Sequence, residues 1–157
     1  MSNTLLEGRS AIVTGGGRGI GKAICEMLLN AGASVIIADN GGAIDGSDET
    51  PALAVTVAQE YGDRALPFSK NIASPEAACE MVNLALDAFG GIDIVVNCAA
   101  ILRDGLVFKS SPEDWDIVVK NNLSAAYYLI NAVTPLLRDQ FKKGRGHGDT
   151  YNWGRII

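Results

Sequence analysis

Short apolar runs alternate along the chain with longer segments in which apolar residues recur every three or four positions. The runs, which predict buried parallel strands, lie at 11–13, 34–39, 65–68 and 92–97, and a fifth begins near 153. The longer segments, which predict amphipathic helices, lie at 20–31, 51–61, 75–89 and 112–137. This alternation of strand and helix predicts an α/β fold built on a parallel sheet.

Local signals mark several helix boundaries and helix faces. Ser-Pro-Glu begins two of the helical segments, at Ser74 and at Ser111, as expected for a capping serine followed by proline at the first helical position. Gly90 is expected to end the first of these two helices. The apolar stripes predict which helix faces are buried, namely Ile20, Ile24, Met27, Leu28 and Ala31 in the first helix and Ala126, Ile130, Val133 and Leu137 in the last.

A glycine-rich turn separates the first predicted strand from the first helix. Residues 14–21 read Thr-Gly-Gly-Gly-Arg-Gly-Ile-Gly. A helix amino terminus offers unpaired N–H groups and a partial positive charge, and glycine lets a phosphate approach the backbone. The spacing fits TGxxxGxG through Thr14, Gly15, Gly19 and Gly21, and it does not fit GxGxxG. The turn therefore predicts a site for a phosphate-bearing ligand.

A P-loop nucleotide site is the rival interpretation of the same glycines. Residues 16–22 match GxxxxGK, but Ala23 follows where a P-loop needs a serine or threonine hydroxyl for magnesium. Preferential binding of magnesium-ATP would support this rival.

Asp39 ends the second predicted strand, eighteen residues after Gly21. An acidic residue at this place in a strand–helix–strand nucleotide fold hydrogen-bonds the adenosine ribose hydroxyls. A carboxylate there also repels a 2′-phosphate, which favours NAD over NADP, whereas Arg18 in the turn is a cation that would accept that phosphate. A plain acidic residue at a strand end is the simpler alternative.

Composition and charge restrict the remaining possibilities. The 157 residues are 48% hydrophobic and carry a net charge of −5, which predicts one globular domain and argues against nucleic acid and anionic membrane as partners. We expect no secretory signal and, from three widely spaced cysteines, a reducing cytoplasmic location. The acidic residues at 45–49 do not match an EF-hand, so no metal site is expected. The basic, glycine-rich stretch 140–152 is interpreted as a flexible surface connection, not an RNA-binding tail.

The turn at residues 14–21 resembles the cofactor loop of the short-chain dehydrogenase/reductase family. Further similarity lies at residues 71–72, at 97–100 and around Asn122. Cys98 and Ala100 depart from the usual Asn-Asn-Ala-Gly. The resemblance implies a Rossmann-type doubly wound parallel sheet, truncated at the start of the fifth strand, with residues 1–157 forming an incomplete dehydrogenase domain.

The resemblance also assigns roles to individual residues. It implies NAD binding, with NADP less favoured, by Thr14, Gly15, Arg18, Gly19, Ile20, Gly21, Asp39, Asn71, Ile72, Asn97 and Ala99. Asn71 stands where the family usually has aspartate and can accept a hydrogen bond from the adenine amino group. Asn122 is implied to complete the active site by binding a water through its backbone and bending the helix. A surface asparagine pair, Asn121 and Asn122, is the alternative.

The implied activity is hydride transfer between nicotinamide and a secondary alcohol or ketone. Residues 101–104 and the loop at 40–50 resemble the branch that oxidises 3-hydroxyacyl thioesters, sometimes within multifunctional β-oxidation enzymes. The family helix corresponding to 112–137 commonly forms half of a dimer interface, which implies a homo-oligomer when the enzyme is complete.

The family's catalytic serine and Tyr-x-x-x-Lys pair have no counterpart in this sequence. The resemblance therefore covers only the amino-terminal part of a family member. We predict no turnover by this chain alone, and apolar surface left uncovered. The alternative is a dinucleotide-binding module that does no catalysis, and the DNA after the last codon would discriminate between the two.

Overall fold

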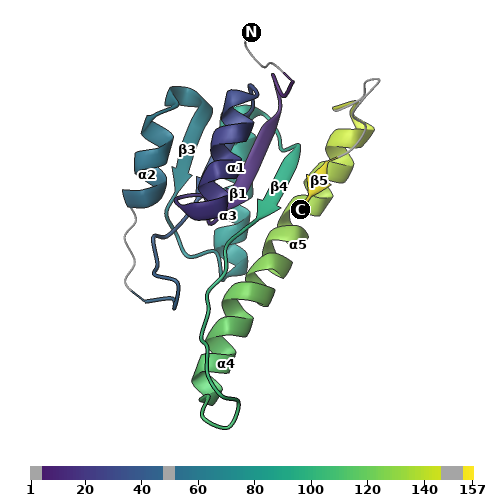
Figure 1. Ribbon diagram of the computed structural model, residues 1–157. Helices are drawn as coiled ribbons and strands as arrows, with labels where there is room; N and C mark the ends of the chain where they lie inside the picture. Colours follow the sequence, from purple (N-terminus) through teal and green to yellow (C-terminus); the bar gives the residue numbers. More distant parts are fainter. Residues whose placement is uncertain (1–4, 48–51, 146–153) are drawn as a thin grey trace.

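A parallel five-stranded sheet organises the computed structural model, which describes residues 5–47, 52–145 and 154–157 (Figure 1). The strand order is β3-β2-β1-β4-β5. In chain order the strands are β1 (Ser10–Thr14), β2 (Ser34–Ala38), β3 (Ala65–Phe68), β4 (Ile94–Asn97) and β5 (Arg155–Ile156). The order reverses between β1 and β4, as in doubly wound folds. The predicted Rossmann-type fold is therefore confirmed.

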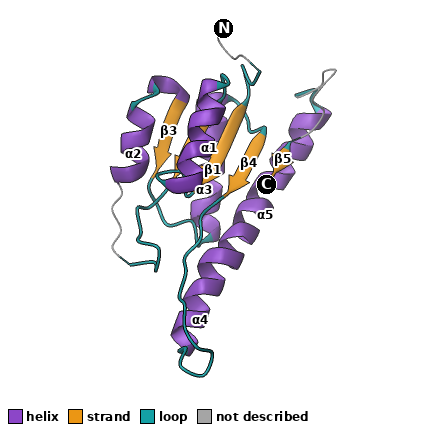
Figure 2. Ribbon diagram, viewed as in Figure 1, coloured by secondary structure: helices purple, strands orange, loops and turns teal. Residues whose placement is uncertain are grey.

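Helices cover both faces of the sheet (Figure 2). They are α1 (Gly19–Asn30), α2 (Ala52–Gln59), the 3₁₀ turn η1 (Gly62–Arg64), α3 (Pro75–Phe89), α4 (Pro112–Val118), the π-helical turn η2 (Val119–Ser124) and α5 (Ala125–Lys142). One apolar cluster joins α1 and α2 to the sheet, and a second joins α3 and α5 to it. Alternate residues of β1 divide between them, because Ala11 and Val13 lie in the first cluster and Ile12 in the second.

The predicted caps are confirmed. The side chain of Ser74 accepts a hydrogen bond from the backbone N–H of Ala77 at 3.1 Å, and Ser111 accepts one from Asp114 at 3.0 Å. Gly90 adopts the left-handed conformation that ends α3. Pro51, expected at the start of α2, lies outside the described residues.

The predicted buried stripe of α1 is wrong in part. Ile20 and Met27 are 76% and 73% exposed, whereas Gly21, Cys25 and Leu29 are buried. The glycine turn packs directly on the start of the helix, so only a residue without a side chain fits at its inner surface. This requirement rotates α1 so that the row through Gly21 faces the sheet.

The stripe of α5 is displaced in a similar way. Its buried row is Ala125, Leu129, Val133 and Leu137, while Ile130 remains 43% exposed. Val133 and Leu137 were predicted correctly, but the row continues toward the amino terminus in steps of four. Steps of four keep this row directed at α3, against which α5 packs.

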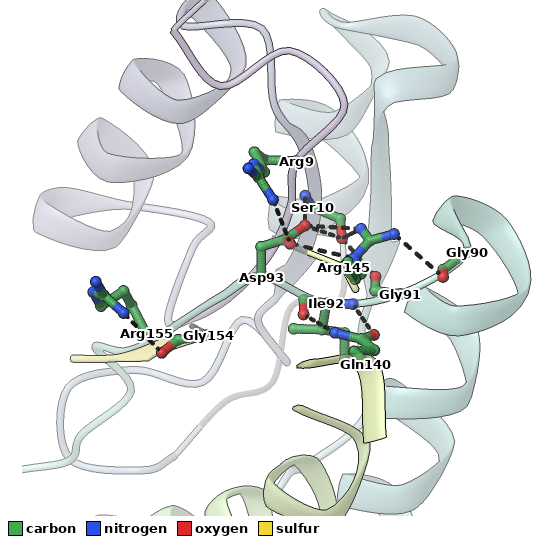
Figure 3. Close-up of polar contacts among 10 residues, drawn as sticks. All are labelled: Arg9, Ser10, Gly90, Gly91, Ile92, Asp93, Gln140, Arg145, Gly154 and Arg155. Carbon is green, nitrogen blue, oxygen red and sulfur yellow. Dashed lines mark hydrogen bonds and ion pairs between the residues drawn. The ribbon is translucent and has the colours of Figure 1, made fainter. Parts of the chain in front are cut away.

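A polar cluster fastens the end of α5 to the amino-terminal ends of the strands (Figure 3). Asp93 is only 2% exposed; its carboxylate accepts the backbone N–H of Ser10 at 2.9 Å and pairs with Arg145 at 2.8 Å and Arg9 at 3.3 Å. The amide of Gln140 bonds both backbone groups of Ile92. The prediction of a loose connection from residue 140 is therefore wrong as far as residue 145, and residues 146–152 lie outside the described part.

Large apolar side chains are exposed after β4 and on the outer sides of α4 and α5. They include Leu102, Leu106, Val107, Phe108, Trp115, Leu123 and Tyr127. None of the helices in the described part is long and apolar enough to cross a membrane.

Candidate functional site

A cleft of about 370 Å³ opens at the carboxyl ends of the parallel strands. Segments that follow β1, β2, β3 and β4 all contribute to it, and α4 and η2 add one residue each. Its lining residues are Gly15, Arg18, Ile20, Gly21, Ala38, Asp39, Asn40, Gly42, Ala43, Ile44, Gly46, Lys70, Asn71, Ile72, Cys98, Ala99, Ala100, Ile101, Ile117 and Asn121. In open α/β sheets, ligands bind in the crevice at this end, where the strand order reverses.

The glycine turn forms one side of the cleft, where the backbone packs too tightly for side chains. Gly15 has a φ of +67°, and a Cβ there would lie 3.0 Å from the backbone nitrogen of Ala99. A Cβ on Gly21 would overlap the carbonyl oxygen of Gly15. The turn ends at Gly19, where α1 begins and its first N–H groups have no helical partner. Gly15 and Gly21 both line the cleft, so at these two positions the backbone meets it without a side chain.

Asp39 is held in a fixed position beside this turn. One carboxylate oxygen accepts the backbone N–H of Gly17 at 2.9 Å, and the other accepts that of Gly41 at 2.7 Å. Its own N–H donates to the carbonyl of Phe68 at 3.0 Å. A carboxylate oxygen has capacity for more than one donor, so both can still accept from a hydroxyl in the cleft.

Arg18 also lines the cleft, but its guanidinium donates to the carbonyl of Gly42. The loop after β2 therefore engages both charged residues that the sequence singled out, Asp39 through Gly41 and Arg18 through Gly42.

Thr14 and Asn97 lie next to the cleft and do not line it. The Thr14 hydroxyl donates to the side-chain oxygen of Asn97 at 2.9 Å and accepts the N–H of Ala99 at 3.1 Å. Thr14 is fully buried. These two residues join the carboxyl ends of β1 and β4 and fix the segment after β4, from which Ala99 reaches the cleft.

Asn71 and Ile72, which follow β3, both line the cleft. The side-chain oxygen of Asn71 accepts a hydrogen bond from the N–H of Ala73 at 2.8 Å, and its NH₂ group has no hydrogen-bond partner among the described residues. Ile72 packs against the cluster beneath α3 and α5. Lys70, which the sequence analysis did not select, also lines the cleft and pairs with Glu80.

The helix containing Asn122 departs from α-helical geometry where the sequence analysis predicted a bend. Residues 119–124 form a π-helical turn, of a kind that often marks functional sites. The Asn122 amide donates to the carbonyl of Ile101 and accepts its N–H, both at 2.9 Å. Asn122 thus holds the segment after β4 and does not itself line the cleft.

Asn121, which was not predicted as a site residue, lines the cleft together with Ile117. The Asn121 amide nitrogen donates to the carbonyl of Ile117 at 2.8 Å. The adjacent pair of asparagines was the available signal, but a regular helical count does not say which of the two faces the cleft.

Cys98 lines the cleft and is half-buried. Burial raises the pKa of its thiol, and burial together with the nearby Cys98 raises the pKa of Cys25 to about 12. Both cysteines are therefore protonated near neutral pH, as expected for thiols that are not nucleophiles. Across residues 5–47, 52–145 and 154–157, no cluster of histidine, cysteine and acidic residues could hold a metal ion.

Comparisons with known proteins point to one protein family. A family model described as short chain dehydrogenase matches residues 9–147. The chain is 35% identical to the peroxisomal multifunctional enzyme type 2 of Mus musculus, covering 96% of this chain and 19% of that protein. It is 34% identical to the hydroxyacyl-CoA dehydrogenase ChsB1 of Mycobacterium tuberculosis, covering 99% of this chain and 48% of the relative.

A solved structure has the same fold. The 3-ketoacyl-(acyl-carrier-protein) reductase from Brucella melitensis, complexed with NADH, superposes with a TM-score of 0.79 at 30% identity. The alignment covers 89% of this chain and 55% of that one. The chain spans about half the length of two further relatives. Its alignments cover 48% of one of these proteins and 57% of the other.

Proposed function

The chain belongs to the short-chain dehydrogenase family, and from this premise we propose that its cleft binds NAD for hydride transfer between nicotinamide and a secondary alcohol or ketone. One observation carries the proposal: the carboxylate of Asp39 is fixed by the N–H groups of Gly17 and Gly41 at the edge of a cleft that the glycine turn also lines. Family membership favours this function over the P-loop interpretation.

We assign the pyrophosphate to the glycine turn. At the start of α1 the first N–H groups have no helical partner, and a Cβ on Gly19 would meet nothing within 4 Å, so the backbone is open there. This is the arrangement that binds phosphate at helix amino termini, where the partial positive charge of the helix adds to the hydrogen bonds. Gly19 and Ile20 begin the helix there.

We assign the adenosine ribose to Asp39 and prefer NAD to NADP on that basis. A carboxylate with both oxygens fixed accepts from the ribose hydroxyls and repels a 2′-phosphate. Arg18, the cation that would offset this repulsion, is engaged by the carbonyl of Gly42. This hydrogen bond uses one nitrogen of a guanidinium that stays charged, so our preference for NAD rests on the Asp39 carboxylate.

Some of the remaining site residues are assigned to contact the dinucleotide, and others to support the segment after β4. We propose that Asn71 and Ile72 flank the adenine and that Ala99 lies along the nicotinamide side, because all three line the cleft. Thr14, Asn97 and Asn122 support the segment after β4 through their hydrogen bonds. NADH, when bound, supplies the hydride; the residues described here hold and orient it.

The substrate class we propose is a 3-hydroxyacyl or 3-oxoacyl thioester. The names of the relatives support it, since they include a hydroxyacyl-CoA dehydrogenase and an acyl-carrier-protein reductase. The complete enzyme is proposed to be a cytoplasmic homo-oligomer that uses the outer side of α5, where Tyr127 is exposed.

Replacing Asp39 by asparagine should weaken NADH binding about 10- to 100-fold, the usual range for a hydrogen bond to a charged group. NADPH binding should fall less, because the repulsion of its phosphate is also removed. Fluorescence titration with both nucleotides measures this change in preference. The control is Asp87→Asn, which removes an exposed carboxylate on α3. Equal losses for NADH and NADPH would contradict the assignment.

The 157-residue chain alone should bind NADH without turning over. None of its four tyrosines is followed by lysine four positions later. A phenol that titrates near pH 10 needs a nearby cation to act as acid or base at neutral pH. Oxidation of NADH in the presence of a 3-oxoacyl thioester is the assay, and a measurable rate above the uncatalysed rate would refute this expectation.

A further inference from the structure

Two loops that are far apart in the sequence meet at the cleft. The loop after β2 contributes Gly42, Ala43, Ile44 and Gly46 to the lining, and the segment after β4 contributes Ala100 and Ile101. We call residues 42–47 the strap. The N–H of Leu102 donates to the carbonyl of Ile44 at 2.7 Å, so the strap and the second segment are joined backbone to backbone. They therefore close one side of the cleft together.

The side chain of Arg103, in the segment after β4, contacts both the strap and α4. Its Nε donates to the carbonyl of Asp45 in the strap at 2.6 Å, and its Nη1 pairs with the carboxylate of Asp114 on α4 at 3.1 Å. A partly exposed ion pair contributes little stability by itself. Here the ion pair orients the Arg103 side chain, because Asp114 holds the guanidinium where its Nε can reach the strap.

Hydrogen bonds within the strap also fix its conformation. The carboxylate of Asp45 accepts both the N–H and the hydroxyl of Ser47, at 2.9 and 2.6 Å, and these bonds lower the pKa of Asp45. The N–H of Gly46 donates to the carbonyl of Ala43 at 2.9 Å. Gly46 has a φ of +83°, and a Cβ there would lie 3.2 Å from Cδ1 of Ile101. The strap thus fits closely against the facing segment.

The other end of the strap reaches the residues assigned to the ribose. Gly41, which precedes the strap, donates to Asp39, and Gly42 accepts from Arg18. Displacement of the strap at Asp45 would therefore shift the preceding backbone, residues 41–44, and with it the Asp39 carboxylate that Gly41 holds.

We propose that Arg103 is a positioning residue that holds the strap across the adenosine end of the cleft and so retains a bound dinucleotide. The inference rests on the proposed function, because it concerns how long that ligand stays. Arg103 does not line the cleft, so it acts through Asp45 and the strap and not by contact with the ligand.

The test is the rate of NADH dissociation, measured by stopped-flow displacement from the 157-residue chain. For Arg103→Ala we expect dissociation about fivefold faster, the factor that one net hydrogen bond is worth. Arg103→Lys keeps a charge for Asp114 and should recover part of the effect. Gly46→Ala perturbs the strap independently and should also speed dissociation. Arg138→Ala, at an exposed arginine of α5, is the control.

Hydrogen exchange of the free chain separates positioning from a general loss of stability. In Arg103→Ala the amide of Leu102 should exchange faster, while the amides of β1 and β4 should keep their protection. Unchanged dissociation in both Arg103→Ala and Gly46→Ala would overturn the inference and leave the proposed function intact. Failure of the unsubstituted chain to bind NADH would instead overturn the proposed function.

Discussion

Replacing Gly21 by alanine is expected to reduce NADH affinity about 100-fold, because losing hydrogen bonds to a charged phosphate costs about 1.5–3 kcal/mol for each bond. The new Cβ would overlap the carbonyl oxygen of Gly15, which is backbone and cannot rotate away. The turn must then open, and its N–H groups move away from the pyrophosphate. Overpacking of this kind also costs roughly 1–3 kcal/mol of folding free energy.

The measurement for Gly21→Ala is a fluorescence titration with NADH, accompanied by urea unfolding. Gly105→Ala is the matched control, because Gly105 lies outside the cleft and a Cβ there would meet only the Ser110 hydroxyl oxygen, at 3.3 Å. Its affinity and stability should equal those of the unsubstituted chain. Retention of full NADH affinity by Gly21→Ala would mean that the turn does not hold the phosphates.

Replacing Asp93 by alanine should produce the largest loss of stability, about 3–5 kcal/mol, as expected when one partner of a buried ion pair is removed. Asp93 is almost fully buried, and its loss leaves Arg145, Arg9 and the N–H of Ser10 without this acceptor. Arg9→Ala should cost much less, because the buried Asp93 carboxylate then keeps Arg145 and the N–H of Ser10 as partners.

Urea unfolding measures the change for Asp93→Ala, with Asp87→Ala as the exposed control. NADH affinity under native conditions should remain unchanged, because the Asp93 cluster contacts the start of β1 and the cleft lies beyond its end. A loss below about 1 kcal/mol, the usual limit for exposed ion pairs, would show that the cluster is dispensable.

Local sequence signals predicted the strands, the capped helix starts and the glycine turn correctly. Each of these depends on residues that are near one another in the chain, such as Ser74 and Ala77 at the start of α3. The buried face of α1 could not be predicted in the same way. Ile20 and Met27 are apolar and correctly spaced, but close packing of Gly21 on Gly15 decides the rotation of the helix.

The parts of the site that the sequence analysis missed depend on contacts between distant segments. The strap joins the segment after β4 across about sixty residues, through Ile44 and Leu102, and no local pattern indicates that pairing. The π-helical turn decides that Asn121 faces the cleft while Asn122 holds Ile101. Arg145 was interpreted as part of a loose connection because its partner, Asp93, lies far back in the chain.

A crystal structure of the chain with NADH tests the central claim most directly. We expect the pyrophosphate against backbone N–H groups between Gly15 and Gly21, and the adenosine ribose hydroxyls donating to the carboxylate of Asp39. NADH bound elsewhere, or a ribose that makes no contact with Asp39 while the dinucleotide occupies the cleft, would contradict it.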